Sequence, residues 1–595
     1  MRQKLTILFI IAFSSLAASQ DRPNARSMVI SKYGIVATSQ VLASQAGAEI
    51  LGRGGSAVDA AIAANAALGV MEPDMNGIGG DLFAIYWDAK SGKLYGLNAS
   101  GWAPKALTID YLKDKGATKM PEEGIDTATV PGAVEGWNQM HGRWGRLSWS
   151  EVLAPAIFYA ENGFPVQELI GTDWSEAPTK LRNDPESRRV FLVQDRAPRM
   201  GEIFMNRDLA KALRLIADAG PRAYYTGDIA KAILATEHEL SGTMSADDLR
   251  EFSAEWVDPI STTYRGWKVY ELPPNVQGMA ALEMLNIMEQ SQPAKSGPLS
   301  AQEIHKRVEA MKLAYADLAR YNADPRFAKV PVQSLISKDY ARQRAQQINP
   351  QKANCNPQAG MPPSSDTTYL TAVDSDGNIV SLIQSNFSSF GSGITVRGMG
   401  FVLQNRGALF MLDPNKPDAL APRKRPFHTI IPAFMEHGDD HIGFGIMGGA
   451  NQPLAHAQFV SNIVDYGMNL QAAMETARFT VRSNFDLSCK ILIEDRVPAN
   501  VRQQLNGMGH RLEVRGDFSM YMGRGQAIDH NSKTGLNYAA SDARTDGSAE
   551  PQPPPTLAPS ERLLKSWDFV TNLITFPTHL DCRFDRRYVA DFGCC

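Results

Sequence analysis

Two β-forming runs that flank a short turn most constrain the fold of this chain of 595 residues. Residues 367–373 read Thr-Thr-Tyr-Leu-Thr-Ala-Val, residues 379–384 read Ile-Val-Ser-Leu-Ile-Gln, and an Asp-Gly pair lies between them. Aromatic and β-branched residues favour strands, and Asp-Gly suits a tight hairpin turn. The sequence therefore predicts a β-hairpin over residues 367–384.

Other segments have helical or strand character. Ser56 can cap a helix over residues 56–70, and an apolar stripe predicts a second helix over residues 301–323. A strand at 442–447 is expected to lead through a glycine pair into a helix at about 453–466. Helices mixed with strands and hairpins predict a layered α/β architecture with an antiparallel component.

The composition is that of an ordinary globular protein. Hydrophobic residues make up 44% and charged residues 21% of the chain, and the formal net charge is -4. Because no basic excess or like-charged block is present, the sequence predicts no nucleic-acid surface. It also contains no Walker loop, no Gly-x-Ser-x-Gly nucleophile elbow and no His-Glu-x-x-His helix.

Two further patterns admit both a functional and a structural interpretation. His437 and His441 flank Gly-Asp-Asp, which predicts an exposed turn rather than a metal site, and the ten histidines show no metal-ligand spacing. The glycines of residues 77–80 do not fit a dinucleotide-binding loop, so a tight strand connection is favoured over ligand contact. We expect no metal and no cofactor.

The first residues have the order of a secretory signal peptide. Arg2 and Lys4 precede the apolar residues 5–13, and small residues continue to Ser19. The apolar run is too short to cross about 30 Å of hydrocarbon as a helix, which argues against a membrane anchor. We expect residues 1–19 to be removed and the mature protein to be exported, into a periplasm or outside the cell, without membrane attachment.

The cysteines are Cys355, Cys489, Cys582, Cys594 and Cys595. An odd number in an exported chain leaves at least one thiol unpaired or paired between molecules. A chain of this length can bury a large core, so we expect the bulk of it to fold without a disulfide framework. The segment 548–595 begins with a proline-rich spacer and is expected to be a loosely attached C-terminal extension.

The start of the predicted hairpin has a chemical interpretation. Residues 349–366 contain five prolines or glycines and no apolar periodicity, which predicts a solvated linker. If the bond between Asp366 and Thr367 breaks, Thr367 gains an α-amine with a pKa of about 8. This amine can take the proton of the hydroxyl group of the same residue and activate it as a nucleophile. The alternative is a threonine that only begins a strand.

The hairpin sequence resembles the signature of gamma-glutamyltransferases, which here covers residues 367–380 and the Phe-Gly-Ser-Gly of residues 390–393. Further motifs match in order along the chain: Gly54–Ala61, Val130–Gly132, Tyr225–Gly227, Ala314–Asp317, Lys424–Pro426, Gly448–Gly449, Asp465–Gly467 and Ser541–Arg544. Because the ordered matches extend over about residues 28–547, the chain is identified as a member of this family.

The resemblance implies an α+β fold, the four-layer α-β-β-α sandwich of N-terminal-nucleophile hydrolases. It implies a precursor that cuts itself between Asp366 and Thr367. The products are a large subunit, residues 20–366, and a small catalytic subunit, residues 367–547, which stay associated. Thr367 then forms an acyl-enzyme with a small-molecule amide substrate, and water or an acceptor amine resolves it.

The resemblance also implies further catalytic groups. Gly448 and Gly449 offer their backbone N–H groups to the oxyanion, and glycine allows the close backbone approach that this requires. Ser385 takes the place of a family threonine that hydrogen-bonds the nucleophile, so a hydroxyl group is kept.

The residues that bind glutamate in the family are largely replaced. Ser100 stands where glutathione-cleaving members have an arginine for the α-carboxylate, and serine cannot bind a carboxylate bidentately. Leu409 stands where they have an aspartate for the α-amine. His428-Thr429 replaces a Ser-Ser pair, and Tyr369 replaces a histidine.

Arg406 and His428 are new polar groups in the same region. Either they bind a different substrate carboxylate, with Ser100 and Thr429 lining the same site, or Arg406 pairs with a structural acid. The pattern is similar to the branch with cephalosporin-acylase-like and oxamate-hydrolase-like members. Three hypotheses follow: a gamma-glutamyl hydrolase or acyltransferase, a non-glutamyl acylase, and an unprocessed exported binding protein on the same scaffold.

Overall fold

The structure is a computed structural model that describes residues 24–355, 366–481 and 488–555. The predicted signal peptide and most of the predicted C-terminal extension therefore lie outside the described residues. Within the described ranges, no helix is both long and apolar enough to cross a membrane. The compact unit that holds the described helices and strands ends at Gln552.

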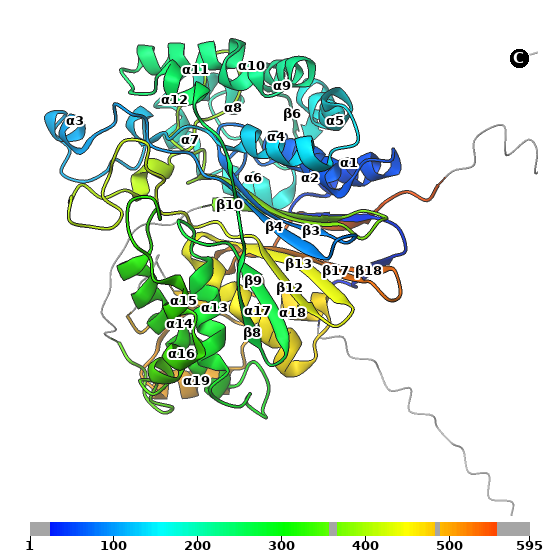
Figure 1. Cartoon of the computed structure of the whole chain (residues 1–595), viewed down its shortest axis with the longest axis vertical. Coiled ribbons are helices and arrows are strands. Elements are labelled where there is room, and N and C mark those ends of the chain that lie inside the picture. Colours follow the sequence, from blue (N-terminus) through cyan, green and yellow to red (C-terminus); the bar gives the residue numbers. More distant parts are fainter. Residues whose placement is uncertain (1–23, 356–365, 482–487, 556–595) are drawn as a thin grey trace, which may run out of the picture. The chain divides into compact units, whose positions relative to one another are not determined.

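Two seven-stranded antiparallel sheets lie at the centre of this unit (Figure 1). The first has the order β19 (Ser548–Pro551), β2 (Ile35–Thr38), β10 (Asp366–Val373), β11 (Ile379–Phe387), β3 (Asp81–Asp88), β4 (Lys93–Ala99) and β7 (Glu255–Val257). The second has the order β1 (Val29–Ser31), β18 (Leu536–Ser541), β17 (Arg524–Asn531), β13 (Asp440–Met447), β12 (Ala433–His437), β9 (Trp267–Glu271) and β8 (Ile260–Tyr264).

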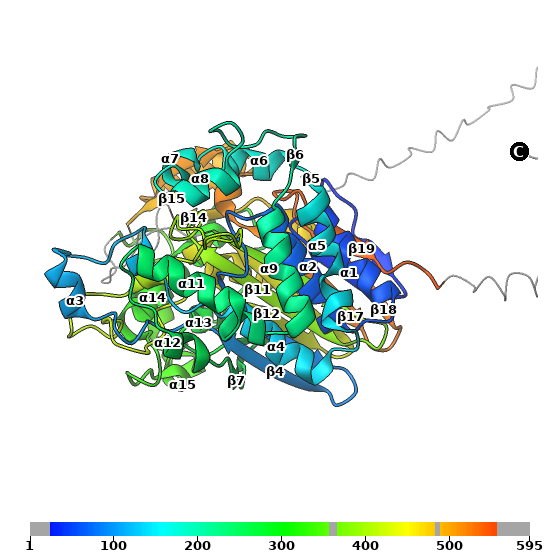
Figure 2. The ribbon, with the colours of Figure 1, turned by 90° about the horizontal axis from the view of Figure 1, so that it is seen from above.

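Helices cover the outer face of each sheet, so the unit has four layers (Figure 1). The first sheet is covered by a group that includes α1 (Val41–Gly52), α2 (Ala57–Met71), α4 (Ala133–Trp144), α5 (Trp149–Asn162) and α9 (Arg207–Ala219). Seen from above, α1, α2, α5 and α9 lie beside one another (Figure 2). The second sheet is covered by a group that includes α13 (Gly278–Met288), α14 (Ala301–Tyr321), α16 (Lys338–Ala345), α17 (Gln452–Tyr466), α18 (Leu470–Glu475) and α19 (Ala499–Gly507).

Shorter elements complete the unit. The remaining helices are α3 (Ile109–Asp114), α6 (Glu168–Trp174), α7 (Pro178–Leu181), α8 (Pro185–Phe191), α10 (Arg222–Tyr225), α11 (Asp228–Glu239), α12 (Ala246–Arg250) and α15 (Val332–Leu335). The 3-10 turns are η1 (Ile125–Thr127), η2 (Arg406–Leu409), η3 (Gly449–Asn451) and η4 (Met520–Met522). Two small sheets contain β5 (Phe164–Pro165) with β6 (Ile203–Phe204), and β14 (Phe479–Val481) with β15 (Lys490–Glu494) and β16 (Arg511–Arg515).

The core lies in three apolar layers, and β10 contributes to two of them. Leu370 and Ala372 pack into the layer between the first sheet and its helices. Tyr369 and Val373 pack into the layer between the two sheets. Because side chains alternate along a strand, the odd-numbered residues of β10, including Thr367, face the second sheet.

The main sequence-based predictions of secondary structure are confirmed. β10 and β11 form the expected antiparallel hairpin. Ser56 caps α2 through a capping box with Asp59, in which each side chain accepts a hydrogen bond from the backbone N–H of the other. His437 and His441 flank the turn of the β12–β13 hairpin, as expected for an exposed connection.

The expected start of the C-terminal extension was wrong. The predicted extension was expected to begin at residue 548, but residues 548–551 form β19, which pairs with β2 in the first sheet. Tertiary pairing therefore moves the end of the compact unit to Gln552. Cys355 and Cys489 form a disulfide, a pairing that the sequence analysis did not predict.

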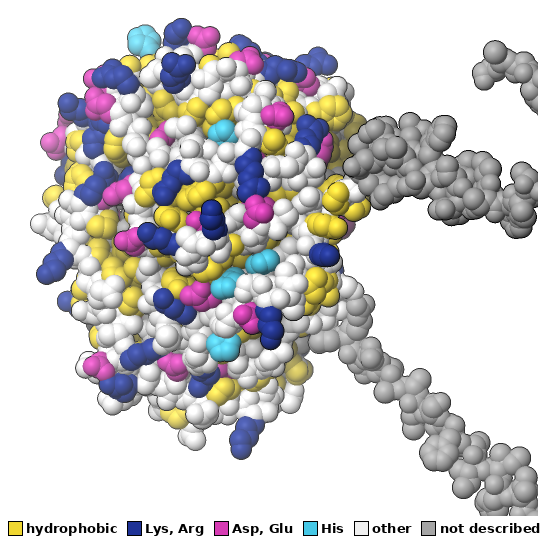
Figure 3. All heavy atoms as spheres, turned by 45° about the vertical axis from the view of Figure 1, so that its right-hand side comes forward, with side chains coloured by type: hydrophobic (Ala, Val, Ile, Leu, Met, Phe, Trp, Pro, Cys, Tyr) yellow, Lys and Arg dark blue, Asp and Glu magenta, His cyan; other side chains and the backbone are white. Residues whose placement is uncertain are grey.

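Basic and acidic side chains alternate over the face drawn in Figure 3, and no field of one sign covers it. This mixed pattern matches the small formal net charge of -4. The absence of a nucleic-acid surface remains a prediction from composition.

Candidate active site

Thr367 is the second residue of β10 and its side chain is fully buried. Its Oγ1 donates a hydrogen bond to Ser385 Oγ on β11, at 3.3 Å. The pairing register shifts here: Asp366 pairs with Phe387 and Thr368 pairs with Gln384, so β11 has one residue more than β10 opposite Thr367. Such a bulge re-aims side chains and is common beside active sites.

Phe387 holds the bulge in place. Its φ is +81°, a region that non-glycine residues rarely adopt, and its backbone N–H donates to Ser385 Oγ at 2.8 Å. Ser385 Oγ therefore accepts from both the Thr367 hydroxyl and the Phe387 amide. These two hydrogen bonds orient the hydroxyl groups of Ser385 and Thr367 toward each other. The contact agrees with the role that the family resemblance implies for Ser385.

The second sheet brings the glycine pair toward Thr367. On β10, Thr371 lies against Gly443 of β13, and Tyr369 lies against Gly445: a Cβ atom added to these glycines would be 2.9 Å from Thr371 Oγ1 and 2.4 Å from the Tyr369 ring. Thr367 lies two residues before Tyr369 on β10, and Met447 lies two residues after Gly445 on the antiparallel course of β13. Alternation thus directs Thr367 toward the end of β13, where Gly448 follows.

Gly448 and Gly449 adopt a backbone conformation that suits glycine. Their φ values are +136° and +60°. They form the turn between β13 and α17. The buried Gln277 side chain donates from Nε2 to Gly449 O at 2.8 Å and also to Thr429 O. Gln277 thereby ties the glycine turn to the segment that carries Thr429.

Arg406, in η2, is fully buried, and only part of its guanidinium is hydrogen-bonded by described residues. Nη1 donates to Thr429 Oγ1 at 2.9 Å, and the guanidinium lies 4.3 Å over the Phe387 ring. Nε and Nη2 are buried and have no hydrogen-bond partner among the described residues. Arg406 also forms no ion pair within those residues, and Asp81 is the buried acid whose charge acts on it.

Asp81 and His428 form the polar wall beside Arg406. Asp81 Oδ2 lies 3.0 Å from His428 Nε2, and Asp81 Oδ1 accepts from Gly101 N at 2.8 Å. Burial raises the pKa of Asp81 to about 7, although the Gly101 hydrogen bond and the Arg406 charge act against this rise. Burial, with a smaller effect of Arg406, holds the pKa of His428 well below its usual value.

The protonation states follow from these contacts. When Asp81 is ionised, a neutral His428 donates from Nε2 to its carboxylate, and His428 Nδ1 is then a buried acceptor without a partner in the described ranges. Burial lowers the pKa of Arg406 to about 9, partly offset by the charge of Asp81, so Arg406 remains a cation at neutral pH. The site therefore presents a buried positive charge with two donor nitrogens that no described residue contacts by a hydrogen bond.

The other predicted substrate-binding positions lie around this cluster. Ser100 is buried, and its Oγ accepts from Asn275 Nδ2 at 3.2 Å rather than contacting Arg406. Leu409 is packed in the apolar core against the second sheet. Tyr369 Oη hydrogen-bonds Ser381 Oγ at 2.8 Å. The structure thus unites Arg406, His428 and Thr429, and leaves Ser100 at the margin.

Sequence reasoning missed three residues that hold the site together: Asp81, Gln277 and Phe387. Asp81 directly follows the glycines of residues 77–80, which form the expected tight connection between α2 and β3. A Cβ on Gly80 would lie 2.5 Å from Ser385 O, so this loop must approach the bulge closely. No local signal distinguishes Gln277 or Phe387, because their roles depend on residues far away in the chain.

One group of potential metal ligands lies away from this site. His305, Glu309 and His510 place one ligand atom each within 4.8 Å of one another. His305 Nδ1 and His510 Nε2 are 2.8 Å apart and hydrogen-bond directly, and Lys312 Nζ pairs with Glu309 at 2.7 Å. These groups satisfy one another and a lysine ammonium lies among them, so the arrangement does not favour a cation.

Comparison with known proteins agrees with this architecture. The sequence model of the family described as Gamma-glutamyltranspeptidase matches residues 43–552. The chain belongs to the gamma-glutamyltranspeptidase family. The predicted family and the four-layer fold of N-terminal-nucleophile hydrolases are thereby confirmed, and the chain is a hydrolase of this family.

Individual relatives of this gamma-glutamyltranspeptidase-family hydrolase have several names. A glutathione hydrolase-like YwrD proenzyme from Bacillus subtilis (strain 168) is 38% identical over 526 residues, which cover 88% of this chain and 99% of the relative. An oxamate amidohydrolase proenzyme from Klebsiella pneumoniae is 34% identical over 530 residues, covering 87% and 98%. The crystal structure of a cephalosporin acylase from Bacillus halodurans has 40% identity and a TM-score of 0.84, covering 90% of this chain and 99% of that one.

Proposed function

We propose that this hydrolase cuts itself between Asp366 and Thr367 and then uses Thr367 to cleave amides whose acyl group carries a distal carboxylate. The observation that carries the substrate class is Arg406, a buried cation with two donor nitrogens that have no hydrogen-bond partner among the described residues. Buried charges are normally paired, and a guanidinium edge matches a carboxylate. An anionic substrate group supplies the missing partner.

The proposed chemistry begins after scission. The freed α-amine of Thr367 takes the proton from Oγ1, and the oxygen attacks the amide carbonyl to form a tetrahedral oxyanion. Backbone N–H groups of Gly448 and Gly449 stabilise this oxyanion, a contribution of about 3–4 kcal/mol per donor. The ammonium returns the proton to the departing amine, which leaves an ester on Thr367. Water or an acceptor amine then releases the acyl group.

The site favours acyl groups without an α-amino group. Leu409 places an apolar side chain where glutamate-binding members have a carboxylate, and Ser100 is already engaged by Asn275. An ammonium buried there without a partner loses several kcal/mol of hydration. The proposed substrates are therefore glutaryl amides and related dicarboxylic monoamides, and gamma-glutamyl amides are the second candidate because relatives are named glutathione hydrolase proenzymes.

The sheet topology supports two chains that stay together after scission. The hairpin β10–β11 lies between β2 and β3 in the first sheet. Both flanking strands belong to the large subunit, residues 20–366, and the hairpin belongs to the small one.

We propose that residues 1–19 direct export before this assembly, which the N-terminal mass of the mature protein would test.

Scission is tested on a denaturing gel run with reductant. The purified protein should give two bands, and the smaller should begin at Thr367 by N-terminal mass analysis. Thr367→Ala removes the nucleophile and should leave one full-length band, whereas Thr367→Ser retains a hydroxyl group and should still be cut. A single band that persists on incubation of the unchanged protein would support the unprocessed binding protein instead.

Substrate class is tested with two anilides that differ by one amino group. Glutaryl anilide and gamma-glutamyl anilide share the distal carboxylate, so their comparison isolates the α-amine position. We expect kcat/KM to be at least about tenfold higher for the glutaryl compound, because the Leu409 side chain offers the ammonium no hydrogen-bond acceptor. Equal or faster gamma-glutamyl turnover would show that other residues bind the α-amine.

A further inference from the structure

We infer that the disulfide between Cys355 and Cys489 joins the large and small subunits covalently after the chain is cut. This inference rests on the proposed scission between Asp366 and Thr367. Cys355 lies before the scission point and Cys489 lies after it, 134 residues further along the chain. A cut inside a loop that a disulfide closes leaves two polypeptides held by that bond.

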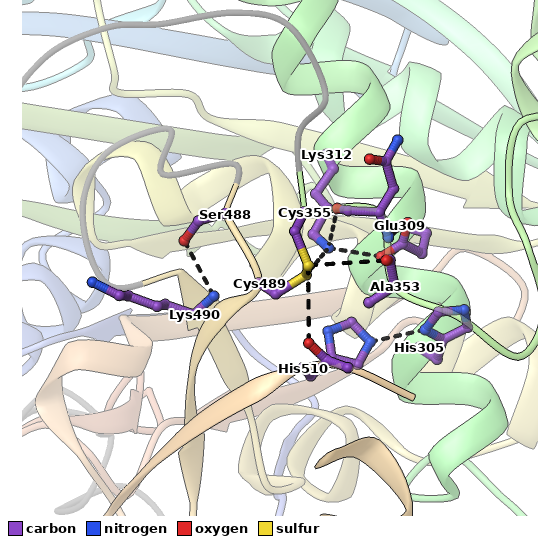
Figure 4. Close-up of a disulfide and its surroundings, with 11 residues drawn as sticks. His305, Glu309, Lys312, Ala353, Cys355, Ser488, Cys489, Lys490 and His510 are labelled. Carbon is purple, nitrogen blue, oxygen red and sulfur yellow. Dashed lines mark hydrogen bonds and ion pairs between the residues drawn. A yellow bond between two sulfur atoms is a disulfide. The ribbon is translucent and has the colours of Figure 1, made fainter. Parts of the chain in front are cut away.

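The structure anchors both cysteines independently of the segment that is cut. Figure 4 shows Cys355 and Cys489 joined by their sulfur atoms beside Lys312 and Glu309 of α14. Lys312 Nζ donates to Asn354 O at 2.9 Å, and Asn354 N donates to Glu309 at 3.1 Å. The residues just before Cys355 are thus attached to the helical layer that covers the second sheet.

The small-subunit side is anchored as well. Cys489 directly precedes β15, and it is almost fully buried. Ala353 N donates to Met508 O at 2.8 Å, across the two prospective subunits. Because these contacts do not involve the bond at Asp366, scission leaves the geometry of the disulfide unchanged.

The two sulfur atoms differ in access. Cys355 is exposed, Cys489 is 1% exposed, and Lys312 Nζ lies 3.8 Å from Cys489 Sγ. A dithiol reductant reaches Cys355: its thiolate bonds to Cys355 Sγ, the S–S bond breaks, and the electron pair leaves on Cys489 Sγ beside the ammonium. The second thiol of the reductant then releases Cys355 and becomes oxidised with the first. The folded protein can therefore be reduced.

The link changes how the cut protein behaves. Two chains joined by a covalent bond remain at a high effective concentration of each other after unfolding, whereas unlinked chains separate on dilution. Recovery of activity after removal of guanidinium should therefore be independent of protein concentration while the disulfide is intact. After reduction and alkylation, recovery should fall as the protein is diluted.

The test compares denaturing gels of one preparation with and without reductant, after free thiols are alkylated. The protein carries Cys582→Ser, Cys594→Ser and Cys595→Ser, so that only Cys355 and Cys489 remain. We expect one band near full length without reductant and two bands with it. Cys489→Ser in the same background should give two bands on both gels.

The remaining outcomes separate a failure of the disulfide link from a failure of scission. Two bands on both gels from the protein with Cys355 and Cys489 intact would overturn the covalent link while leaving the proposed scission in place. One band on both gels would refute scission and with it the inter-subunit link. If Cys489→Ser fails to fold, peptide mapping of the unreduced protein decides: a linked peptide pair containing Cys355 and Cys489 is expected, and its absence overturns the inference.

Discussion

Replacing Arg406 with methionine should separate substrate recognition from stability. Arg406 is buried, its pKa is lowered to about 9 chiefly by burial, and its Nε and Nη2 atoms are unpartnered among the described residues. A methionine of similar length keeps contact with the Phe387 ring and removes a charge that has no ion pair among the described residues. Exchanging a poorly compensated buried charge for an apolar side chain is often neutral or stabilising. The free energy of unfolding should therefore stay constant or rise.

Activity should fall, and only for carboxylate-bearing substrates. The two free donors of Arg406 allow a bidentate pair with the carboxylate, and truncation of one partner of such a buried pair costs about 3–5 kcal/mol. At about 1.4 kcal/mol for each tenfold change, kcat/KM for glutaryl anilide should fall about 100- to 5,000-fold. Pentanoyl anilide has a methyl group in place of the carboxylate and should change less than about fivefold.

The assay measures kcat/KM for both anilides and unfolding in urea for Arg406→Met, Arg406→Lys and a control. Arg406→Lys retains the charge without the planar fork and should lie between the two extremes. The matched control is Arg425→Met: Arg425 is also buried, but it pairs with Glu255 and donates to Ser100 O. It should lower stability and change the ratio of the two rates far less than Arg406→Met does. Equal losses with both anilides in Arg406→Met, or a loss of stability, would refute the carboxylate-binding role.

Three further predictions concern the residues around Thr367. Burial raises the pKa of Asp81 to about 7, so its ionisation above that pH offsets the charge of Arg406. The ratio of kcat/KM for glutaryl anilide to kcat/KM for pentanoyl anilide should therefore fall as pH rises through about 7. In Asp81→Asn the ratio should not change with pH. A pH-dependent ratio in that variant would contradict this assignment. Gly448→Ala places a side chain at φ +136° and should lower kcat about 100- to 1,000-fold with little change in KM, measured by steady-state kinetics; an unchanged kcat would exclude the oxyanion role. Ser385→Ala removes the acceptor for Thr367 Oγ1 and Phe387 N and should slow acylation about 2- to 10-fold in a pre-steady-state assay, whereas Ser385→Thr should restore the rate.

Local signals were sufficient for the hairpin that carries the proposed nucleophile and for helix α2. The hairpin at Thr367 follows from β-forming residues on either side of Asp-Gly, and α2 follows from Ser56 and an alanine-rich run. Both depend on interactions within a few residues, which sequence patterns express directly. The glycine pair after β13 was found by resemblance to the family, and the structure adds the left-handed backbone that explains why glycine stands there.

Non-local contacts decided the rest. β19 looked like the start of a proline-rich tail, because its pairing partner β2 lies more than 500 residues earlier in the chain. The sequence also could not show whether Arg406 pairs with an acid of the protein, since such an acid could have come from any part of the fold. Only the structure shows that Thr429, Phe387 and Asp81 surround it and leave two donors unpartnered among the described residues.

The sequence by itself determined the hairpin and the family and placed the proposed nucleophile, Thr367, because these depend on contiguous residues and on ordered motifs. Only the tertiary structure decided which side chains meet at Arg406, where the compact unit ends, and that Cys355 pairs with Cys489. The physical reason is the same in each case. Burial, hydrogen-bond satisfaction and sulfur-to-sulfur distance are properties of groups brought together from distant segments, and spacing along the chain does not specify them.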